Sequence, residues 1–358
     1  MIAELRIDLD IIAANWRLLC NRHPGGAVAA VVKADAYGLG AAQVAPRLLR
    51  EGCRHFFTAH PAEAAALRPL LPGVMIGVLN GLWPGEAGEY AARDLVPVLG
   101  SAREVEAWGA EARRLGRRLP ALLHVDTGMN RLGLDARDLD LIANEPERLA
   151  SIELLAIMTH LVSAEQPENP FNQRQLQRFR AACARLPAAP RSIANSSGMF
   201  LGPDFASDLA RPGAALYGVN PTPGRPSPVT VPLRLRAKVL QLRDVPAGEP
   251  VGYNGIWTAQ RPSRIATIAV GYADGYLRSL SNAAEACFDG RRVPLVGRVS
   301  MDLTTFDVTD HPGIGPDSWL ELIGPAVTPD QLAAWAGTNG YEILTSLGAR
   351  YPRAYGGA

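Results

Sequence analysis

Between residues 28 and 220 the chain alternates short apolar runs with longer amphipathic stretches. The apolar runs predict eight β-strands: AAVVK, HFFTA, VMIGVLN, LVPVL, ALLHVD, LLAIMTHL, RSIANSS and RPGAALYG. Most segments between them have helical periodicity, namely AAQVAPRLLREG, SAREVEAWGAEARRLG, DARDLDLIANEPERLA and QRQLQRFRAACARL. The seventh strand is followed by a short segment with little helical pattern, so a helix is least clearly predicted in the seventh strand–helix unit. Eight strand–helix units are typical of an α/β fold, the (β/α)8 TIM barrel.

A proline-rich segment, NPTPGRPSPVTVP, ends this alternation and predicts a linker near residues 220–231. The runs that follow predict a mostly antiparallel β domain: LRLRAKVLQLRDV, SRIATIAVGY, RRVPLVGRVSMDLTTFDV and WLELIG. TPDQLAAWAGT predicts one late helix, with Thr328 or Asp330 near its N-terminal cap. We therefore expect a barrel over residues 1–228 and a β-rich C-terminal domain over residues 229–358. A candidate strand in residues 1–10 is a possible partner of the second domain.

Composition narrows the class of protein. With 358 residues, 47% hydrophobic and 20% charged, the chain has enough apolar residues for a large core. A net charge of +1 without a long basic run argues against nucleic acid or an anionic membrane as partner. No apolar stretch has the length of a membrane span, and MIAELRIDLD does not resemble a signal peptide. The four cysteines form no CxxC and predict neither a disulfide framework nor a metal cluster, which favours a reducing cytoplasm.

The most informative single residue is Lys33, which follows the apolar run AAVVK. Burial lowers the pKa of a lysine and frees its amine to attack a carbonyl. The segment ADAYGLG then ends the strand and supplies a phenol, Tyr37. A lone lysine after a strand is more often a surface residue. Combined with the residues below, this arrangement suits a Schiff base with pyridoxal phosphate.

Further polar residues follow other predicted strands. His160 ends the sixth strand, Asn195 and Ser196 end the seventh, and the eighth begins with Arg211, Pro212, Gly213 and Ala214. In a TIM barrel the chemistry lies where strands end, and phosphate is often bound after strands 7 and 8. Each motif alone is common. Together, at one end of one barrel, they predict an active site.

The motifs VVKADAYGLG, HVDTGMNRLG, MTHL, ANSSG, RPGAALYG, VGYNG, VGYADGY and VGRVSMDL, in this order, resemble the alanine racemase family over essentially the whole chain. The resemblance implies pyridoxal 5'-phosphate as cofactor and interconversion of L-alanine and D-alanine, which supplies D-alanine for peptidoglycan. It also implies a head-to-tail homodimer with shared active sites.

Carried onto this sequence, the resemblance makes Lys33 the residue that holds the cofactor as an internal aldimine and serves as one of two bases. Tyr253, in VGYNG, would be the other base, reaching the partner's barrel from the β domain. Two bases on opposite faces are what racemisation requires. Arg211 would face the pyridine nitrogen and keep it unprotonated. His160 would lie between Arg211 and Tyr253.

The remaining implied roles concern binding. Arg131 would contact both the cofactor's phenolic oxygen and the substrate carboxylate, which would also meet the backbone N–H of Met301 from the partner chain. The phosphate would be bound by a group of small or phenolic residues and backbone amides: Tyr37, Asn195, Ser196, Gly213 and Ala214. Gate or orienting roles would fall to Tyr272 and Asp302.

Two positions depart from the family pattern. Where many relatives have a carbamylated lysine that orients the arginine, this chain has His124. Because an imidazole cannot be carbamylated in that way, we expect a bound anion such as chloride, or an amide contact, to orient Arg131. Ala349 stands where some relatives have a phosphate-binding tyrosine, so one phosphate contact is expected to be missing.

Several alternatives remain open at this point. The chain could be a broad-specificity racemase acting on serine or other amino acids, or a decarboxylase with the same cofactor; Tyr253 as second base favours racemisation. A non-catalytic protein that only binds pyridoxal phosphate would not need residues 231–358. A metal-dependent barrel enzyme is disfavoured, since His124, His160 and the nearby acids lack a recognisable ligand spacing.

Overall fold

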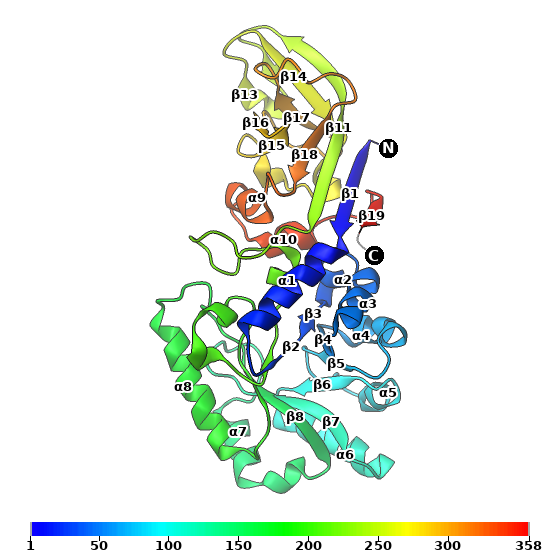
Figure 1. The fold of residues 1–358 in the computed structure, drawn as a ribbon, viewed down its shortest axis with the longest axis vertical. Helices are drawn as coiled ribbons and strands as arrows, with labels where there is room; N and C mark the ends of the chain where they lie inside the picture. Colours follow the sequence, from blue (N-terminus) through cyan, green and yellow to red (C-terminus); the bar gives the residue numbers. More distant parts are fainter. Residues whose placement is uncertain (1, 357–358) are drawn as a thin grey trace.

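The computed structural model describes residues 2–356, which form a barrel and a β-rich body joined end to end (Figure 1). Seven parallel strands follow one another in chain order around the barrel. They are β3 (Ala30–Val31), β4 (His55–Thr58), β5 (Met75–Val78), β6 (Val96–Leu99), β7 (Leu119–His124), β8 (Ile152–Met158) and β9 (Arg191–Ser192). Alternate residues point in opposite directions, so that Phe57 and Val98 fill the barrel interior while Phe56 and Leu99 pack against the helices.

A short eighth strand closes the barrel. β10 (Leu209–Ala210) pairs in parallel with β2 (Ala27–Val28), which lies just before β3 on the other side. On the β9 side, the N–H of Arg211 donates to the carbonyl of Ala194 at 2.8 Å. The (β/α)8 prediction is therefore confirmed.

The position predicted for the last strand was wrong. Instead of a strand over residues 211–218, the structure has β10 before Arg211 and a 3-10 helix, η5 (Ala214–Tyr217), after it. Pro212 has no N–H to donate to a ladder, and the N–H groups of Gly213 and Ala215 donate to Ser196 instead. The apolar run is nevertheless buried, because Leu216 and Tyr217 pack into the core.

Helices surround the barrel on the outside, as Figure 1 shows. They are α1 (Leu9–Arg22), α3 (Ala41–Glu51), α4 (Pro61–Leu67), α5 (Ala87–Ala92), α6 (Ala102–Leu115), α7 (Ala136–Asn144) and α8 (Pro170–Arg185), with short 3-10 turns η1 (Arg68–Leu70) and η2 (Pro146–Leu149). The short segment α2 (Lys33–Tyr37) has a left-handed backbone and lies at the strand ends instead. α7 ends earlier than its sequence pattern predicts, since Pro146 cannot continue an α-helix. Between β9 and β10 only two 3-10 turns occur, η3 (Gly198–Phe200) and η4 (Pro203–Phe205), in agreement with the weak helical pattern there.

The second body is mostly antiparallel sheet, as predicted. Its strands are β1 (Ala3–Asp8), β11 (Leu233–Val245), β14 (Ser263–Ile268), β15 (Glu285–Phe288), β16 (Arg291–Pro294), β17 (Thr304–Asp307), β18 (Trp319–Ile323) and β19 (Arg353–Gly356), and β12 (Pro250–Val251) forms a small hairpin with β13 (Trp257–Thr258). The 3-10 turns are η6 (Tyr253–Gly255), η7 (Tyr272–Asp274) and η8 (Arg278–Leu280). Two helices complete it, α9 (Pro329–Ala336) and α10 (Gly340–Thr345). The Thr328 hydroxyl accepts from Gln331 N and caps α9.

The first strand of the chain belongs to this sheet. β1 pairs antiparallel with β11, Leu5 opposite Leu235, and parallel with β19, Leu5 opposite Arg353. Figure 1 shows β1 beside the long strand β11, and β19 follows on the other side of β1. α1 then carries the chain down to the barrel. There the buried Asn15 side chain donates to the carbonyl of Thr230 at 2.8 Å and accepts from its N–H at 3.0 Å, which fixes the linker.

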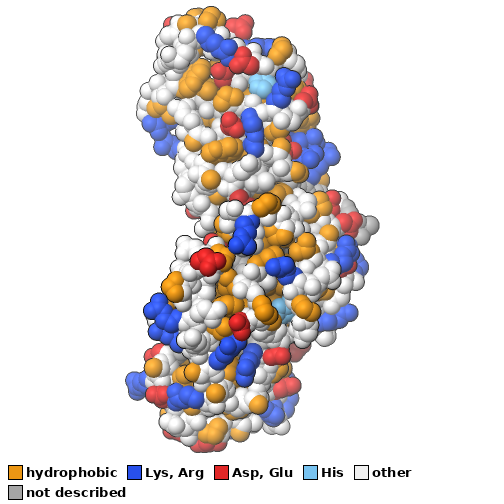
Figure 2. Space-filling view, turned by 60° about the vertical axis from the view of Figure 1, so that its left-hand side comes forward, with side chains coloured by type: hydrophobic (Ala, Val, Ile, Leu, Met, Phe, Trp, Pro, Cys, Tyr) orange, Lys and Arg blue, Asp and Glu red, His pale blue; other side chains and the backbone are white. Residues whose placement is uncertain are grey.

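The outer surface has a waist between the two bodies (Figure 2). On the face shown, apolar side chains gather on the barrel side of the waist, and acidic and basic side chains are interspersed elsewhere. No helix within residues 2–356 is both long and apolar enough to cross a membrane.

Candidate active site

Most of the site residues predicted from the sequence line one cavity of about 410 Å³ at the ends of the barrel strands. Its walls include Lys33, Tyr37, His160, Asn195, Ser196, Arg211, Gly213 and Ala214. Tyr341 and Thr345, both on α10, line it from the β-rich body, although neither belongs to a predicted motif. They are four residues apart and share one helix face, a spacing that could have indicated a common role.

Lys33 follows strand β3 after one intervening residue, Val32, and opens an unusual turn. Four consecutive non-glycine residues, Ala34 to Tyr37, have φ between 51° and 57°, the left-handed region. This conformation costs roughly 1–2 kcal/mol per L-residue. Local hydrogen bonds offset part of that cost: Asp35 Oδ1 accepts from Ala41 N at 2.7 Å, and Ala36 N donates to Val32 O at 2.9 Å. The turn brings the amine and the Tyr37 phenol to the same cavity.

The electrostatic surroundings prepare Lys33 as a nucleophile. Burial is the main cause that lowers the pKa of its amine, and the nearby charge of Arg131 lowers it further. Glu63 has the opposite effect. A lowered pKa increases the neutral fraction of the amine, which is the form that attacks a carbonyl or accepts a proton.

Tyr37 is held by aromatic neighbours and remains a neutral phenol. Its ring centroid lies 4.8 Å from that of Tyr217 and 6.4 Å from that of Tyr341. Burial raises the pKa of Tyr37 to about 12, so the hydroxyl is available as a donor at neutral pH. The hydroxyl lies so close to Gly213 that a Cβ atom at that position would overlap it. Glycine is therefore required there.

A group of hydrogen-bond donors lies where β9 and β10 end. The buried Ser196 Oγ accepts from Gly213 N at 3.0 Å and from Ala215 N at 3.2 Å. Hydroxyl and backbone N–H groups of this kind suit a phosphate. Asn195 lines the same cavity, but its Oδ1 accepts from Gly198 N at 2.8 Å, so its carbonyl holds its own loop.

Arg211 is a buried cation without a buried anion beside it. Its guanidinium donates to the Thr159 carbonyl at 2.6 Å and to the Ser192 hydroxyl. No carboxylate among residues 2–356 forms an ion pair with it. Burial lowers its pKa to about 10, which still leaves it protonated at neutral pH. A guanidinium in this position suits an acceptor atom of a bound ligand, such as a ring nitrogen.

Two histidines lie near this cation, His124 buried and His160 half-buried. Burial, followed by the charge of Arg211, lowers the pKa of His124 to about 4 and that of His160 to about 3. Both imidazoles are therefore neutral at physiological pH. His124 cannot supply the negative charge that the family pattern places near Arg131.

Arg131 is exposed in the loop between β7 and α7. This loop is fixed by Asp126, whose carboxylate accepts from Gly128 N and Met129 N at 2.9 Å each, a contact that the sequence analysis missed. No protein hydrogen bond to the Arg131 guanidinium is found in the described part of the chain. Its charge still contributes to the lowered pKa values of Lys33, His124 and His160, which places it near the cavity.

The structure does not bring every predicted residue to this cavity. Tyr253 on η6, Tyr272 on η7, and Met301 and Asp302 in the loop before β17 lie on the β-rich body, outside its lining. Tyr253 is 68% exposed and Met301 54%. Asp302 forms an ion pair with Arg350 at 2.9 Å. Ala349 is not part of the lining either, and Tyr341 and Thr345 are the α10 residues that reach it.

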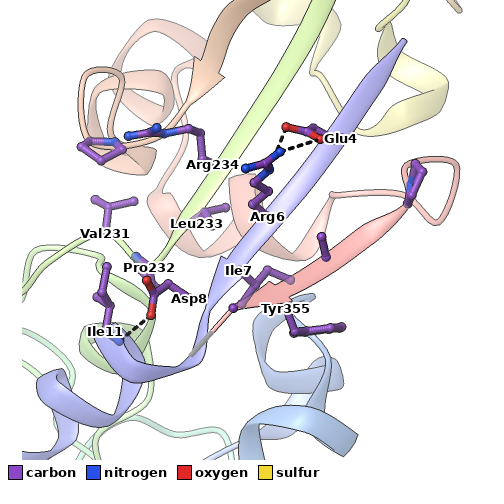
Figure 3. A pocket seen from close by; sticks show the side chains of 14 residues that line it. Glu4, Arg6, Ile7, Asp8, Ile11, Val231, Pro232, Leu233, Arg234 and Tyr355 are labelled. Carbon is purple, nitrogen blue, oxygen red and sulfur yellow. Dashed lines mark hydrogen bonds and ion pairs between the residues drawn. The ribbon is translucent and has the colours of Figure 1, made fainter. Parts of the chain in front are cut away.

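A larger cavity of about 640 Å³ lies at the junction of β1, β11 and β19 (Figure 3). None of the predicted site residues lines it. Its charged side chains interact with near neighbours: Arg6 pairs with Glu4 at 2.9 Å, and Asp8 caps α1 through Ile11 N. Within residues 2–356, no group of three or more His, Cys, Asp or Glu side chains is arranged to hold a metal ion.

Sequence models of two protein domains match the chain: the alanine racemase N-terminal domain over residues 7–221 and the alanine racemase C-terminal domain over residues 232–355. An alanine racemase of Acidiphilium cryptum is 56% identical over 98% of this chain and 97% of its own length. One from Methylobacterium nodulans is 50% identical over 99% and 96%. The crystal structure of alanine racemase from Bartonella henselae with covalently bound pyridoxal phosphate superimposes with a TM-score of 0.96, at 41% identity over 99% of both chains.

Proposed function

The chain belongs to the alanine racemase family, and from this premise we infer that it is a pyridoxal-phosphate-dependent isomerase that interconverts L-alanine and D-alanine. The observation that carries this inference is the meeting of the Lys33 amine, the Arg211 cation and the donors around Ser196 in one cavity. Family membership favours alanine over the broader amino-acid specificity considered above.

The residues present fit the cofactor. Lys33 would bind it covalently, and Ser196, Gly213, Ala214 and Tyr37 would hold its phosphate. When bound, the cofactor withdraws electrons from the substrate and makes the proton on its α-carbon acidic. Arg211 stays protonated and would donate toward the ring nitrogen, which would limit how strongly electrons are withdrawn.

The chain's own groups then move one proton. The Lys33 amine, whose pKa is lowered mainly by burial, would remove the α-proton from one face of the substrate. A proton must return to the opposite face, and we assign that step to Tyr253. The Arg131 guanidinium and the Met301 N–H would bind the substrate carboxylate. His160 would connect Arg211 with the Tyr253 phenol, while Tyr272 and Asp302 would border the entrance and His124 would lie behind Arg131.

We propose that Tyr253 and Met301 act in the cavity of a second copy of the chain, in a head-to-tail homodimer. Residues 229–358 would then complete the partner's active site. Support comes from the exposed apolar side chains on this body, which mark an interaction surface: Tyr253, Ile256, Tyr272, Met301 and Leu303. Each chain alone lacks the second base in its cavity, so a separated monomer should be inactive.

We also propose a cytoplasmic enzyme that supplies D-alanine for peptidoglycan. The location is supported by the four cysteines, Cys20, Cys53, Cys183 and Cys287, all of which are free thiols. The activity is tested by chiral analysis of L-alanine incubated with the purified protein and pyridoxal phosphate. Equal amounts of both enantiomers at the end are expected. No D-alanine despite bound cofactor would overturn the proposed activity.

A further inference from the structure

The left-handed turn after Lys33 needs support from outside itself. Alanine, aspartate and tyrosine do not adopt this backbone freely, yet four such residues adopt it in succession. Such strain persists only where surrounding contacts determine the backbone, and it concentrates at functional sites. The first N–H of the turn, that of Ala34, is available to a group on a neighbouring element.

That group is Glu63 in the first turn of α4. Its Oε1 accepts from Ala34 N at 2.6 Å, and its Oε2 accepts from Ala59 N at 2.9 Å and His60 N at 3.1 Å. One carboxylate therefore connects the left-handed turn to the end of β4. We propose that Glu63 is a positioning residue that fixes this turn and thereby aims the Lys33 amine and the Tyr37 phenol at the cofactor. This inference rests on the proposed function of Lys33.

The charge of Glu63 supports the same role. Burial and Arg131 lower the pKa of Lys33, and Glu63 raises it. The other groups near Lys33 do not replace Glu63. His160 on the loop after β8 is neutral, and the Asp35 carboxylate accepts from Ala41 N. Loss of the Glu63 charge should therefore make Lys33 neutral at a lower pH.

Glu104 provides a matched control for the hydrogen bonds with which Glu63 caps its helix and connects two strand ends. Glu104 occupies the same position in the first turn of α6. Its Oε2 accepts from Gly100 N and from Leu82 N, both at 3.1 Å. It thus connects the ends of two neighbouring strands as Glu63 does, but neither it nor its partners line the cavity. Replacing either glutamate removes similar capping hydrogen bonds.

The test compares Glu63→Ala with Glu104→Ala in full-length enzyme stripped of cofactor and reconstituted with pyridoxal phosphate. We expect Glu63→Ala to raise the cofactor dissociation constant about tenfold, equivalent to about 1.4 kcal/mol, and Glu104→Ala to change it less than twofold. Both should lower the Tm. Equal dissociation constants in the two variants would show that Glu63 only stabilises its helix and would overturn the proposal.

Glu63→Gln, which preserves shape, decides the matter if Glu63→Ala does not fold. The rate of cofactor uptake, followed by its visible absorbance, should reach half its maximum at a lower pH than in the unchanged enzyme, and Glu104→Gln should not move this midpoint. An unmoved midpoint in Glu63→Gln contradicts the proposal. Borohydride reduction of the unchanged enzyme, followed by peptide mapping, identifies the residue that carries the cofactor. This distinguishes failure of the Glu63 proposal from failure of the proposed function of Lys33. Cofactor attached to a residue other than Lys33 would refute the proposed site itself.

Discussion

The hydroxyl of Ser196 and the N–H of Gly213 are joined by a hydrogen bond of 3.0 Å that connects the loops after β9 and β10. Ser196 also accepts from Ala215 N, so a single oxygen organises two backbone donors. In a buried position, removal of that oxygen leaves both N–H groups without this partner. This oxygen therefore organises the end of the cavity where we propose that the phosphate binds.

Ser196→Ala should weaken cofactor binding about tenfold while leaving the covalent attachment at Lys33 intact. The physical reason is the loss of one hydroxyl donor and the disordering of two backbone donors. Titration of the apoenzyme with pyridoxal phosphate measures the effect. Ser263→Ala is the control, since this buried hydroxyl lies on β14, outside the cavity, and donates to the Arg261 carbonyl at 2.9 Å. Equal affinities for both variants would count against a phosphate site here.

Arg211→Glu should divert the enzyme toward transamination. A carboxylate opposite the ring nitrogen favours its protonation and strengthens electron withdrawal, whereas Arg211 opposes it. The measurement is the amount of pyruvate formed for each D-alanine produced, and it should rise. Arg211→Gln removes the cation without adding a carboxylate and should show little pyruvate. An unchanged product ratio in Arg211→Glu contradicts the assignment.

Mixing two inactive variants tests the shared active site. In a head-to-tail dimer, Lys33→Ala and Tyr253→Phe chains combine so that one of the two sites of each mixed dimer contains both intact residues. Random exchange of subunits should then restore about a quarter of the full activity. Tyr253→Phe alone should bind cofactor normally, as absorbance would show. If activity is not restored although mixed dimers form, Lys33 and Tyr253 do not meet across the interface.

An anion beside Arg131 is the fourth expectation. The guanidinium is near the cavity, and neutral His124 does not balance its charge. Crystals soaked in bromide should show an anomalous peak next to Arg131, and crystals of Arg131→Gln should not. Without a peak in the unchanged protein, an amide contact would be the remaining explanation for the orientation of this side chain.

The folded protein should lose stability as the pH falls from about 6.5 toward 4. His124 and His160 have pKa values of about 4 and about 3 when folded, against 6.5 for an ordinary histidine. In this window the two histidines are protonated in the unfolded chain but stay neutral in the folded chain. The free energy of unfolding therefore decreases as the pH decreases. The slope approaches about 1.4 kcal/mol per pH unit for each histidine. Urea unfolding of the apoenzyme at pH 7 and pH 5 measures the loss, and His124→Gln should reduce it.

Secondary structure was predicted correctly where the apolar and polar residues of one segment are sufficient to define it. The alternation in β11 predicts Leu233–Val245, and the apolar run before Lys33 places that lysine correctly at a strand end. The strand predicted over residues 211–218 was wrong because an apolar run of four residues fits a buried strand and a buried 3-10 turn equally well. Glu63 and Tyr341 were missed for another reason: Glu63 bonds to Ala34 on another element, Tyr341 lines a cavity built by the barrel, and only the tertiary fold brings these groups together. Asp126 bonds within its own loop, so the turn pattern of DTGM could have indicated it.

The pairing of β1 with β11 and β19 also affects how the chain can be made and divided. During synthesis the first strand emerges long before its partners, so it must wait, unpaired, while the entire barrel is translated. Such long-range pairing slows folding and leaves an exposed edge open to other chains. For the same reason, a fragment cut at the linker would lack the strand that lies between β11 and the edge strand β19. Supplying residues 1–10 as a separate peptide is a rational way to restore it.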